Sequence, residues 1–398
     1  MSEQLNRERL KSPAPVRELE RRAAELQKAM KAAGIDMILA QNITQYLCGC
    51  NRYMTDTTAE NNYPQSSFLP ADDVVHFIAC SGPPLGAYPP EWARLIGKPY
   101  ATAPYFSPFN YTNEWEGQYV VKWCVDNNAK KIGIAGFGMF YWNYYETIKK
   151  MLPELEIVDV SDMFDEIRAV KSADEQEYIA KTVKVQDKVM GYVRAYAHAG
   201  VREYELRSKL QQVCADHGSE EQIIVLGSAP KGEKFDLMSS FFQNRTLQEG
   251  DQLYVRLSVS GPGGFFCTVG RMFCVDQEPS AQMQADWEKA LAAQKYLADK
   301  LVPGADPQVI FADYNKYLAE GGYKTEKGVF CYGQGYDNVE RPSIQPGETM
   351  KIGCDMCMAM NTSLVNNVSS VYCADSFMIK GDGAVRLHKT PQTIVRTY

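Results

Sequence analysis

The sequence predicts two domains, an α/β domain at residues 1–165 and an α+β domain at residues 166–398. Three observations support this. The length of 398 residues exceeds that of one ordinary domain. In the first part, short apolar runs alternate with helical patterns, as is typical of α/β domains. In the second part, long helices follow one another and strands come as hairpins, as is typical of α+β domains.

The first domain is expected to contain two helices and four strands. Apolar residues repeat at helical spacing over 17–33, where Gly34 ends the pattern, and again over 140–152. Short apolar runs predict strands at 36–40, 74–78, 132–134 and 157–160. Residues 82–116 are rich in Pro, Tyr and Trp without periodicity, so we expect a long ordered loop that covers a site or a partner subunit.

The second domain is expected to open, after a hinge near 167–172, with a long helix over 173–197. Ser172 with Glu175 three residues later is the pattern of a capping box. Further helices are predicted at 201–217, 280–301 and 307–321. Strands are predicted at 223–226, 252–259 and 265–275, the last two joined by the Gly-Pro-Gly-Gly turn at 261–264, and within 350–394.

Composition and charge disfavour several kinds of partner. The 42 basic and 49 acidic side chains give a net charge of −7 without a long Lys/Arg run, so no nucleic-acid partner is expected. No run of about 18 apolar residues occurs, and the start of the chain lacks the apolar core of a signal peptide. We therefore expect a cytoplasmic protein without a membrane partner. The 11 cysteines indicate buried thiols rather than a disulfide framework.

Several blocks of the second half resemble the catalytic domain of the creatinase/prolidase/aminopeptidase P family. They are Arg168-Ala169-Val170-Lys171-Ser172, Gly227-Ser228, Gly250-Asp251 with Gly270-Arg271-Met272-Phe273, Tyr332-Gly333-Gln334-Gly335 with Glu340, and Asp375-Ser376-Phe377-Met378-Ile379. Order and spacing agree over about residues 160–398, whereas the first domain matches more loosely, through residues 42–47 and its strand pattern. The resemblance implies a creatinase-like N-terminal domain and a "pita-bread" catalytic domain. It also implies a homodimer in which the N-terminal domain of one subunit reaches the active site of the other.

The metal ligands of that family have no counterpart in this sequence. Its peptidase members bind two metal ions with two Asp, one His and two Glu. Carried onto this chain, these ligands fall on Arg256 or Leu257, on Cys267 or Thr268, on Tyr332, near Gly353 (Cys354 or Asp355) and on Ala374. The four histidines lie outside these blocks. We therefore expect no metal and no other cofactor.

The expected function is that of a metal-independent lyase or hydrolase acting on a small zwitterionic or carboxylated metabolite. Dimethylsulfoniopropionate, betaine and creatine are examples of such substrates. Creatinase and the dimethylsulfoniopropionate lyases are the most similar members, the latter through residues 67–73 and 113–117. Candidate bases are Tyr332, Glu340, Asp355 and Asp375. Candidate substrate-binding residues are Arg256, Arg271, Arg52, Tyr53, Trp115 and Cys354.

Two other functions remain open from the sequence. A catalytically inactive pita-bread protein would bind a peptide or protein in the emptied groove. A metalloenzyme, either a lyase or an Xaa-Pro peptidase, would use atypical ligands such as Cys267, Cys354 and Cys373. In the metal-independent enzyme, the N-terminal-domain residues Tyr63, Tyr105, Phe106 and Tyr111 would help Tyr53 and Trp115 to enclose a cationic ligand.

Overall fold

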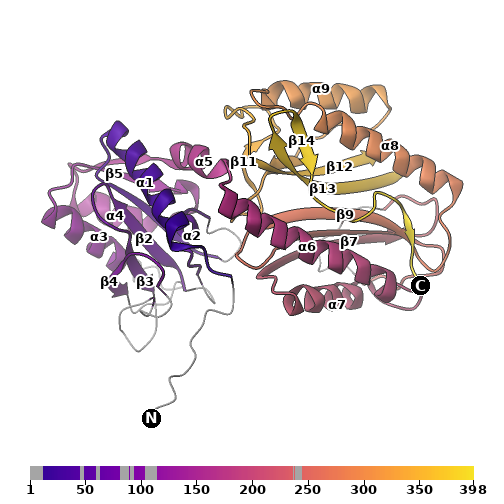
Figure 1. The fold of residues 1–398 in the computed structure, drawn as a ribbon, viewed down its shortest axis with the longest axis horizontal. Coiled ribbons are helices and arrows are strands. Elements are labelled where there is room, and N and C mark those ends of the chain that lie inside the picture. Colours follow the sequence, from indigo (N-terminus) through magenta and orange to yellow (C-terminus); the bar gives the residue numbers. More distant parts are fainter. Residues whose placement is uncertain are drawn as a thin grey trace, which may run out of the picture. The chain divides into compact units, whose positions relative to one another are not determined.

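The computed structural model describes residues 12–44, 49–59, 63–80, 89, 94–103, 114–235, 237 and 244–398. The chain divides into two compact units, Met1–Arg168 and Ala169–Tyr398 (Figure 1). Within the described ranges, no helix combines the length and the apolar character that crossing a bilayer requires.

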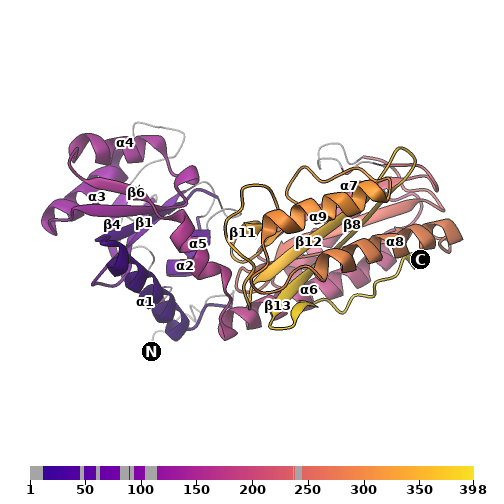
Figure 2. The same ribbon diagram turned by 90° about the horizontal axis from the view of Figure 1, so that it is seen from above.

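The first unit is a mixed sheet with helices on both faces (Figure 2). Its strand order is β4-β3-β2-β1-β5-β6, with bounds Lys98–Ala103, His76–Cys80, Gln65–Pro70, Met37–Asn42, Lys131–Ala135 and Glu156–Asp159. Strand β1 is antiparallel to β2 and parallel to β5. Helices α1 (Val16–Ala33) and α2 (Gly49–Thr55) lie on one face, and α3 (Glu114–Asp126) and α4 (Trp142–Met151) on the other. Helix α5 (Ser161–Ala169) reaches the boundary of the unit.

The α/β class predicted for this unit is confirmed, but the prediction missed α2, α3, α5, β2 and β4. Strand β4 lies inside the stretch that was expected to be a loop. Its residues have no apolar alternation, and parallel pairing with β3 holds them in the sheet. Most of the rest of that stretch, including Tyr105, Phe106 and Tyr111, lies outside the described residues.

The second unit contains a curled sheet of nine strands. The main path is β11-β10-β12-β13-β9-β8-β7, while β14 pairs with β13 and β15 with β9. All these pairings are antiparallel except that of β15 with β9. The bounds of β7 to β15 are Glu221–Ala229, Gln252–Ser260, Phe266–Cys274, Cys331–Gly333, Glu340–Ser343, Cys357–Val365, Ser370–Lys380, Gly383–Arg386 and Val395–Arg396.

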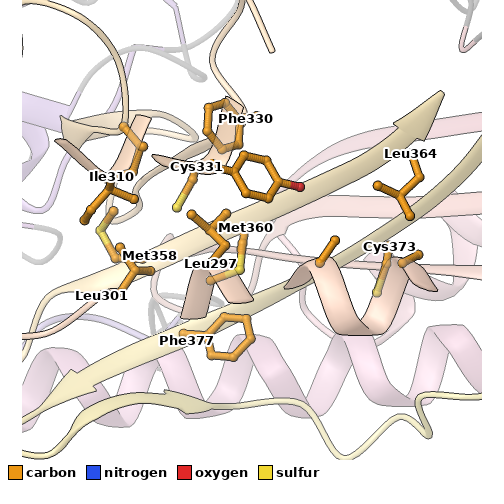
Figure 3. Close-up of a cluster of buried hydrophobic side chains, with 14 of the residues drawn as sticks. Leu297, Leu301, Ile310, Phe330, Cys331, Met358, Met360, Leu364, Cys373 and Phe377 are labelled. Atoms are coloured by element: carbon orange, nitrogen blue, oxygen red, sulfur yellow. The ribbon is translucent and has the colours of Figure 1, made fainter. Parts of the chain in front are cut away.

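Two pairs of helices cover this sheet from outside (Figures 1 and 2). Helices α6 (Ala173–Tyr196) and α7 (Glu203–Asp216) bury the apolar residues of β7, β8 and β9. Helices α8 (Ala281–Ala298) and α9 (Pro307–Glu320) bury those of β12 and β13. Figure 3 shows the second of these cores, in which Leu297 and Leu301 pack near Met358 and Met360. Each fully buried side chain of this kind stabilises the fold by about 1.5–3 kcal/mol.

Helix α6 begins at the capping box that the sequence predicts. Ser172 Oγ accepts a hydrogen bond from the Glu175 backbone N–H at 3.2 Å, and Glu175 Oε2 accepts one from the Ser172 N–H at 2.8 Å. Because the first N–H groups of a helix have no partner within the helix, these two bonds fix where α6 starts.

We expect Ser172→Ala to lower the free energy of unfolding by about 1 kcal/mol, since it removes the cap of a long core helix. Urea denaturation followed by circular dichroism measures the change. Ser208→Ala is the control, because Ser208 lies inside α7 and its hydroxyl donates only to the Tyr204 carbonyl. Equal stability of the two variants would contradict the assigned role of the cap.

Candidate functional site

Four neighbouring strands place four residues in one row across the second unit's sheet. Arg256 of β8 is opposite Gly270 of β9, Gly270 is opposite Ala374 of β13, and Ala374 is opposite Asn361 of β12. We call this the cross-strand row. Gly270 has no side chain and Ala374 has only a methyl group, so Arg256 extends over both. Its Nη1 donates to Asn361 Oδ1 at 3.2 Å.

Neutral polar side chains lie beside the row and are joined by hydrogen bonds. The hydroxyls of Ser258 and Thr268 are 3.1 Å apart, and Gln334 Nε2 donates to Thr268 Oγ1 at 3.0 Å. Ser376 Oγ donates in turn to Gln334 Oε1 at 3.0 Å. We call the row and these four residues the inner face. Because each of these buried groups has a partner, the inner face is a rigid polar surface.

Tyr332 of β10 joins the row through Asn361. Asn361 Nδ2 donates to Tyr332 Oη and to the Phe330 carbonyl, both at 3.3 Å, which fixes the orientation of the amide. Burial raises the pKa of Tyr332, although Arg256 and the bond from Asn361 act in the opposite direction. The phenol is therefore neutral at pH 7 and retains a proton that it can donate.

Arg256 carries a positive charge with spare donors on this face. Among the described residues, the structure records no acidic partner for it, and its buried Nε has no hydrogen-bond partner. A guanidinium keeps its charge at any physiological pH and presents planar pairs of N–H donors. This arrangement favours an anion with two oxygen atoms, such as a carboxylate.

Asp375, a candidate base from the sequence, lies on the helix-covered face of the sheet, since it follows Ala374 on β13. It is fully buried and pairs with Arg271 at 2.8 Å. Arg271 Nη1 also donates to the carbonyls of Gly270 and Ala374, each at 2.8 Å. Arg271 thus holds the backbone beneath the cross-strand row from behind, and Asp375 holds Arg271. The structure gives them a positioning role and no place on the inner face.

Two other candidate bases are also held by cations. Glu340 and Lys171 form a buried ion pair at 2.8 Å. Asp355 lies in the turn before β12, with φ of 59°, and pairs with Lys380 at 2.6 Å. Cys354, expected to contact substrate, is an exposed free thiol in the same turn. Both carboxylates are thus engaged with an ammonium group and are not among the residues of the inner face.

The remaining candidates, Arg52, Tyr53 and Trp115, belong to the first unit. Arg52 lies 3.8 Å from Asp56 in an ion pair. The buried Tyr53 ring packs edge-on against Phe164, with ring centres 5.5 Å apart. Trp115 packs with Tyr63 and Tyr119 near Ala103. A contribution of these residues to the site of another subunit stays a prediction.

The register decides between alternatives that the sequence left open. Arg256, and not the apolar Leu257, lies on the inner face, because Leu257 packs in the core beneath α6 and α7. Similarly, it is the Thr268 hydroxyl that bonds to Ser258.

Sequence reasoning missed Asn361. It placed the first glutamate ligand of the family near Gly353, but the residue that faces Arg256 and Tyr332 is Asn361. The only available signal was strand alternation, which puts Asn361 opposite Ala374 once the turn between β12 and β13 is located.

Comparison with known proteins gives a consistent picture. The profile of metallopeptidase family M24 matches residues 177–391. The Xaa-Pro dipeptidase of Pyrococcus furiosus is 21% identical over 276 residues, which are 67% of this chain and 76% of the relative. Two solved structures are similar across almost the whole chain. The Xaa-Pro dipeptidase from Bacillus anthracis has a TM-score of 0.74 at 17% identity and covers 95% of this chain and 99% of its own. The X-Pro aminopeptidase from Thermotoga maritima has a TM-score of 0.77 at 15% identity and covers 94% and 99%.

The fold is thus that of the pita-bread proteins, as the sequence predicted. The family match extends over more than half of the chain. The chain belongs to metallopeptidase family M24.

These findings overturn the expected function. A metal-independent, non-peptidase lyase or C–N hydrolase of a small metabolite is the wrong prediction, because the family is one of metallopeptidases and two curated relatives bear the name Xaa-Pro dipeptidase. The likeness to the lyases rested partly on residues 67–73. The structure places the first of these in β2, and the adjacent Ser66 donates to the buried Glu116 at 2.6 Å. That segment is part of the sheet scaffold and carries no information about the reaction.

The family name implies a metal centre, and the residues present do not fit one. Within the described ranges, no three or more His, Cys, Asp or Glu residues form a group that could hold a metal ion. Asn361, Thr268, Tyr332 and Ala374 offer no carboxylate or imidazole donor, and the Arg256 guanidinium repels a dication.

The cysteines that were considered as atypical ligands do not supply this set either. Burial raises the pKa of Cys373 to about 12. Burial, and contact with Cys357, raise the pKa of Cys267 well above its ordinary value. Both are neutral thiols at pH 7 in the metal-free protein, and neither belongs to a group of three or more metal-ligating residues within the described ranges.

Asp375→Asn is expected to lower the free energy of unfolding at pH 7 by about 3–5 kcal/mol, because it leaves the buried Arg271 without its counter-charge. Burial raises the pKa of Asp375, but Arg271 and His388 outweigh it, so the folded pKa is below the ordinary value of 3.8. The stabilisation is fully present above pH 3.8 and is lost as the pH falls through the lowered pKa.

Urea titrations at pH 7, 5 and 3 measure this difference between the two proteins. Asp299→Asn is the control, since the Asp299–Lys295 pair is exposed and contributes little. A difference that does not shrink between pH 5 and pH 3 would contradict the assignment.

Proposed function

We propose that the protein binds short peptides and holds their C-terminal carboxylate at Arg256. The observation that carries this proposal is the guanidinium on the inner face, which has spare donors and no acidic partner among the described residues. In this partly buried position, a charge-assisted hydrogen bond is stronger than in water.

The geometry supports a planar anion as the ligand. Asn361 accepts a hydrogen bond from Nη1 of Arg256, which orients the guanidinium, and no acidic residue among those described takes up its other N–H groups. The neutral Tyr332 phenol lies on the other side of Asn361 and supplies a further donor. A carboxylate bound by two parallel N–H groups satisfies this arrangement.

The relatives supply the class of ligand. Curated proteins and solved structures similar to this chain bear the names Xaa-Pro dipeptidase and X-Pro aminopeptidase. A dipeptide has a free carboxylate one residue from its peptide bond. Arg256 would therefore hold one end of the peptide and leave the bond over the neutral part of the inner face.

Hydrolysis of Xaa-Pro dipeptides is the second candidate function, and the names of the relatives favour it. The homodimer, the cytoplasmic location and the absence of a nucleic-acid partner stay predictions from the resemblance and the composition.

Arg256→Met is expected to raise the Kd for alanyl-proline about 10- to 100-fold, since it removes one charged hydrogen-bonding group and keeps a similar stem. Isothermal titration calorimetry measures this. Arg396→Met is the matched control, because Arg396 is half-exposed and lies 3.7 Å from Glu278, away from the inner face.

Asn361→Asp tests the same charge by another route. The change places a carboxylate against Arg256 with almost no change of shape, so it competes with the ligand and should weaken binding at least as much. Unchanged affinity in both the Arg256 and the Asn361 variants would refute the assigned anchor.

The second candidate predicts that the purified protein releases free proline from alanyl-proline and that Arg256→Met lowers this rate. Chromatography of the products measures the rate, with added Mn²⁺, Co²⁺ or Zn²⁺ and with a chelator. No release under any of these conditions would rule out this dipeptidase activity, whereas peptide binding would stand.

A further inference from the structure

The Tyr254 hydroxyl lies in the space that the missing side chain of Gly270 leaves in the cross-strand row. A Cβ atom added to Gly270 would lie 2.2 Å from the hydroxyl oxygen of Tyr254, which is closer than any real contact. The Tyr254 hydroxyl therefore lies directly against Gly270, and only a glycine at position 270 permits this.

Tyr254 lies two residues before Arg256 on β8, so both side chains are on the same face. The residue is 1% exposed, and its ring packs on Tyr372 with centres 5.3 Å apart. The structure records no hydrogen-bond partner for its hydroxyl among the described residues. A side chain that served only to fill this space would need the ring and not the hydroxyl.

The Tyr254 hydroxyl is a donor at every physiological pH. Burial raises the pKa of Tyr254, and Arg256, which acts in the opposite direction, does not cancel this effect. The neutral phenol has a proton to donate, and the described residues provide no acceptor for it. An acceptor would therefore come from a ligand.

We propose that the Tyr254 hydroxyl and the Arg256 guanidinium bind the same carboxylate on the inner face beside Gly270, which makes Tyr254 a specificity-determining residue for acids over amides. That this carboxylate is the C-terminus of a peptide rests on the function proposed above. One carboxylate oxygen accepts from the phenol and the other from the guanidinium, so a ligand without that negative charge loses part of both bonds.

The experiment compares the Kd of alanyl-proline with that of its C-terminal amide, alanyl-prolinamide. We expect Tyr254→Phe to raise the Kd of the acid about tenfold and to change the Kd of the amide by less than about threefold. Tyr372→Phe is the matched control, since its hydroxyl donates to the Phe235 carbonyl and should leave the ratio unchanged.

Gly270→Ala gives a second, independent test, because the added methyl group must displace the Tyr254 hydroxyl. It should reduce the preference for the acid while thermal unfolding shows a folded protein. An acid-to-amide ratio that is unchanged in Tyr254→Phe overturns the proposal.

Benzoate, a carboxylate without a peptide bond, separates this proposal from the function on which it rests. Binding of benzoate that depends on Tyr254, without binding of alanyl-proline, would refute peptide binding and retain the carboxylate site. Binding of neither probe to the unmodified protein overturns both.

Discussion

The geometry of the inner face depends on the two smallest residues of the cross-strand row. Gly270 and Ala374 lie between Arg256 and Asn361, and any larger side chain at either position would separate them. The contact at 3.2 Å therefore exists because two neighbouring strands carry almost no side chain at this level. Gly270 also admits the Tyr254 hydroxyl, which lies where a Cβ atom would be. The small residues in the middle of the row thus bring Arg256, Asn361 and the Tyr254 hydroxyl together on one surface.

Charge is distributed unevenly across the second unit. The buried Arg271 is paired with Asp375, and the buried Lys171 is paired with Glu340, as the cost of burying a charge requires. Arg256 differs, because it has no acidic partner among the described residues. The acidic metal ligands of the metallopeptidases would fall beside it. Because Arg256 and neutral residues stand where those ligands would fall, this face attracts anions rather than metal cations.

Much of the fold could be predicted from sequence because its signals are local. The capping box at Ser172 fixed the start of α6, and the Gly-Pro-Gly-Gly turn fixed the β8–β9 hairpin. Strand β4 gave no such signal, since it is held by a neighbour. Sequence analysis identified Arg256 and Tyr332 as site residues but not Asn361 and Tyr254. The positions of the last two on the inner face depend on the register of neighbouring strands, which the sequence does not show. The function was mispredicted because the sequence argument rested on the absence of the family's metal ligands. That absence does not indicate which molecule the site binds.

Arg271 ties the two faces of the sheet together. Its guanidinium holds the carbonyls of Gly270 and Ala374 from the helix side, directly behind the place where a ligand would rest. An incoming molecule would therefore meet a floor that is already ordered, and association would cost little conformational entropy in the backbone. The few polar groups of the inner face can then bind a ligand tightly, because Arg271 has already fixed the backbone during folding. Arg271 itself would not contact the ligand.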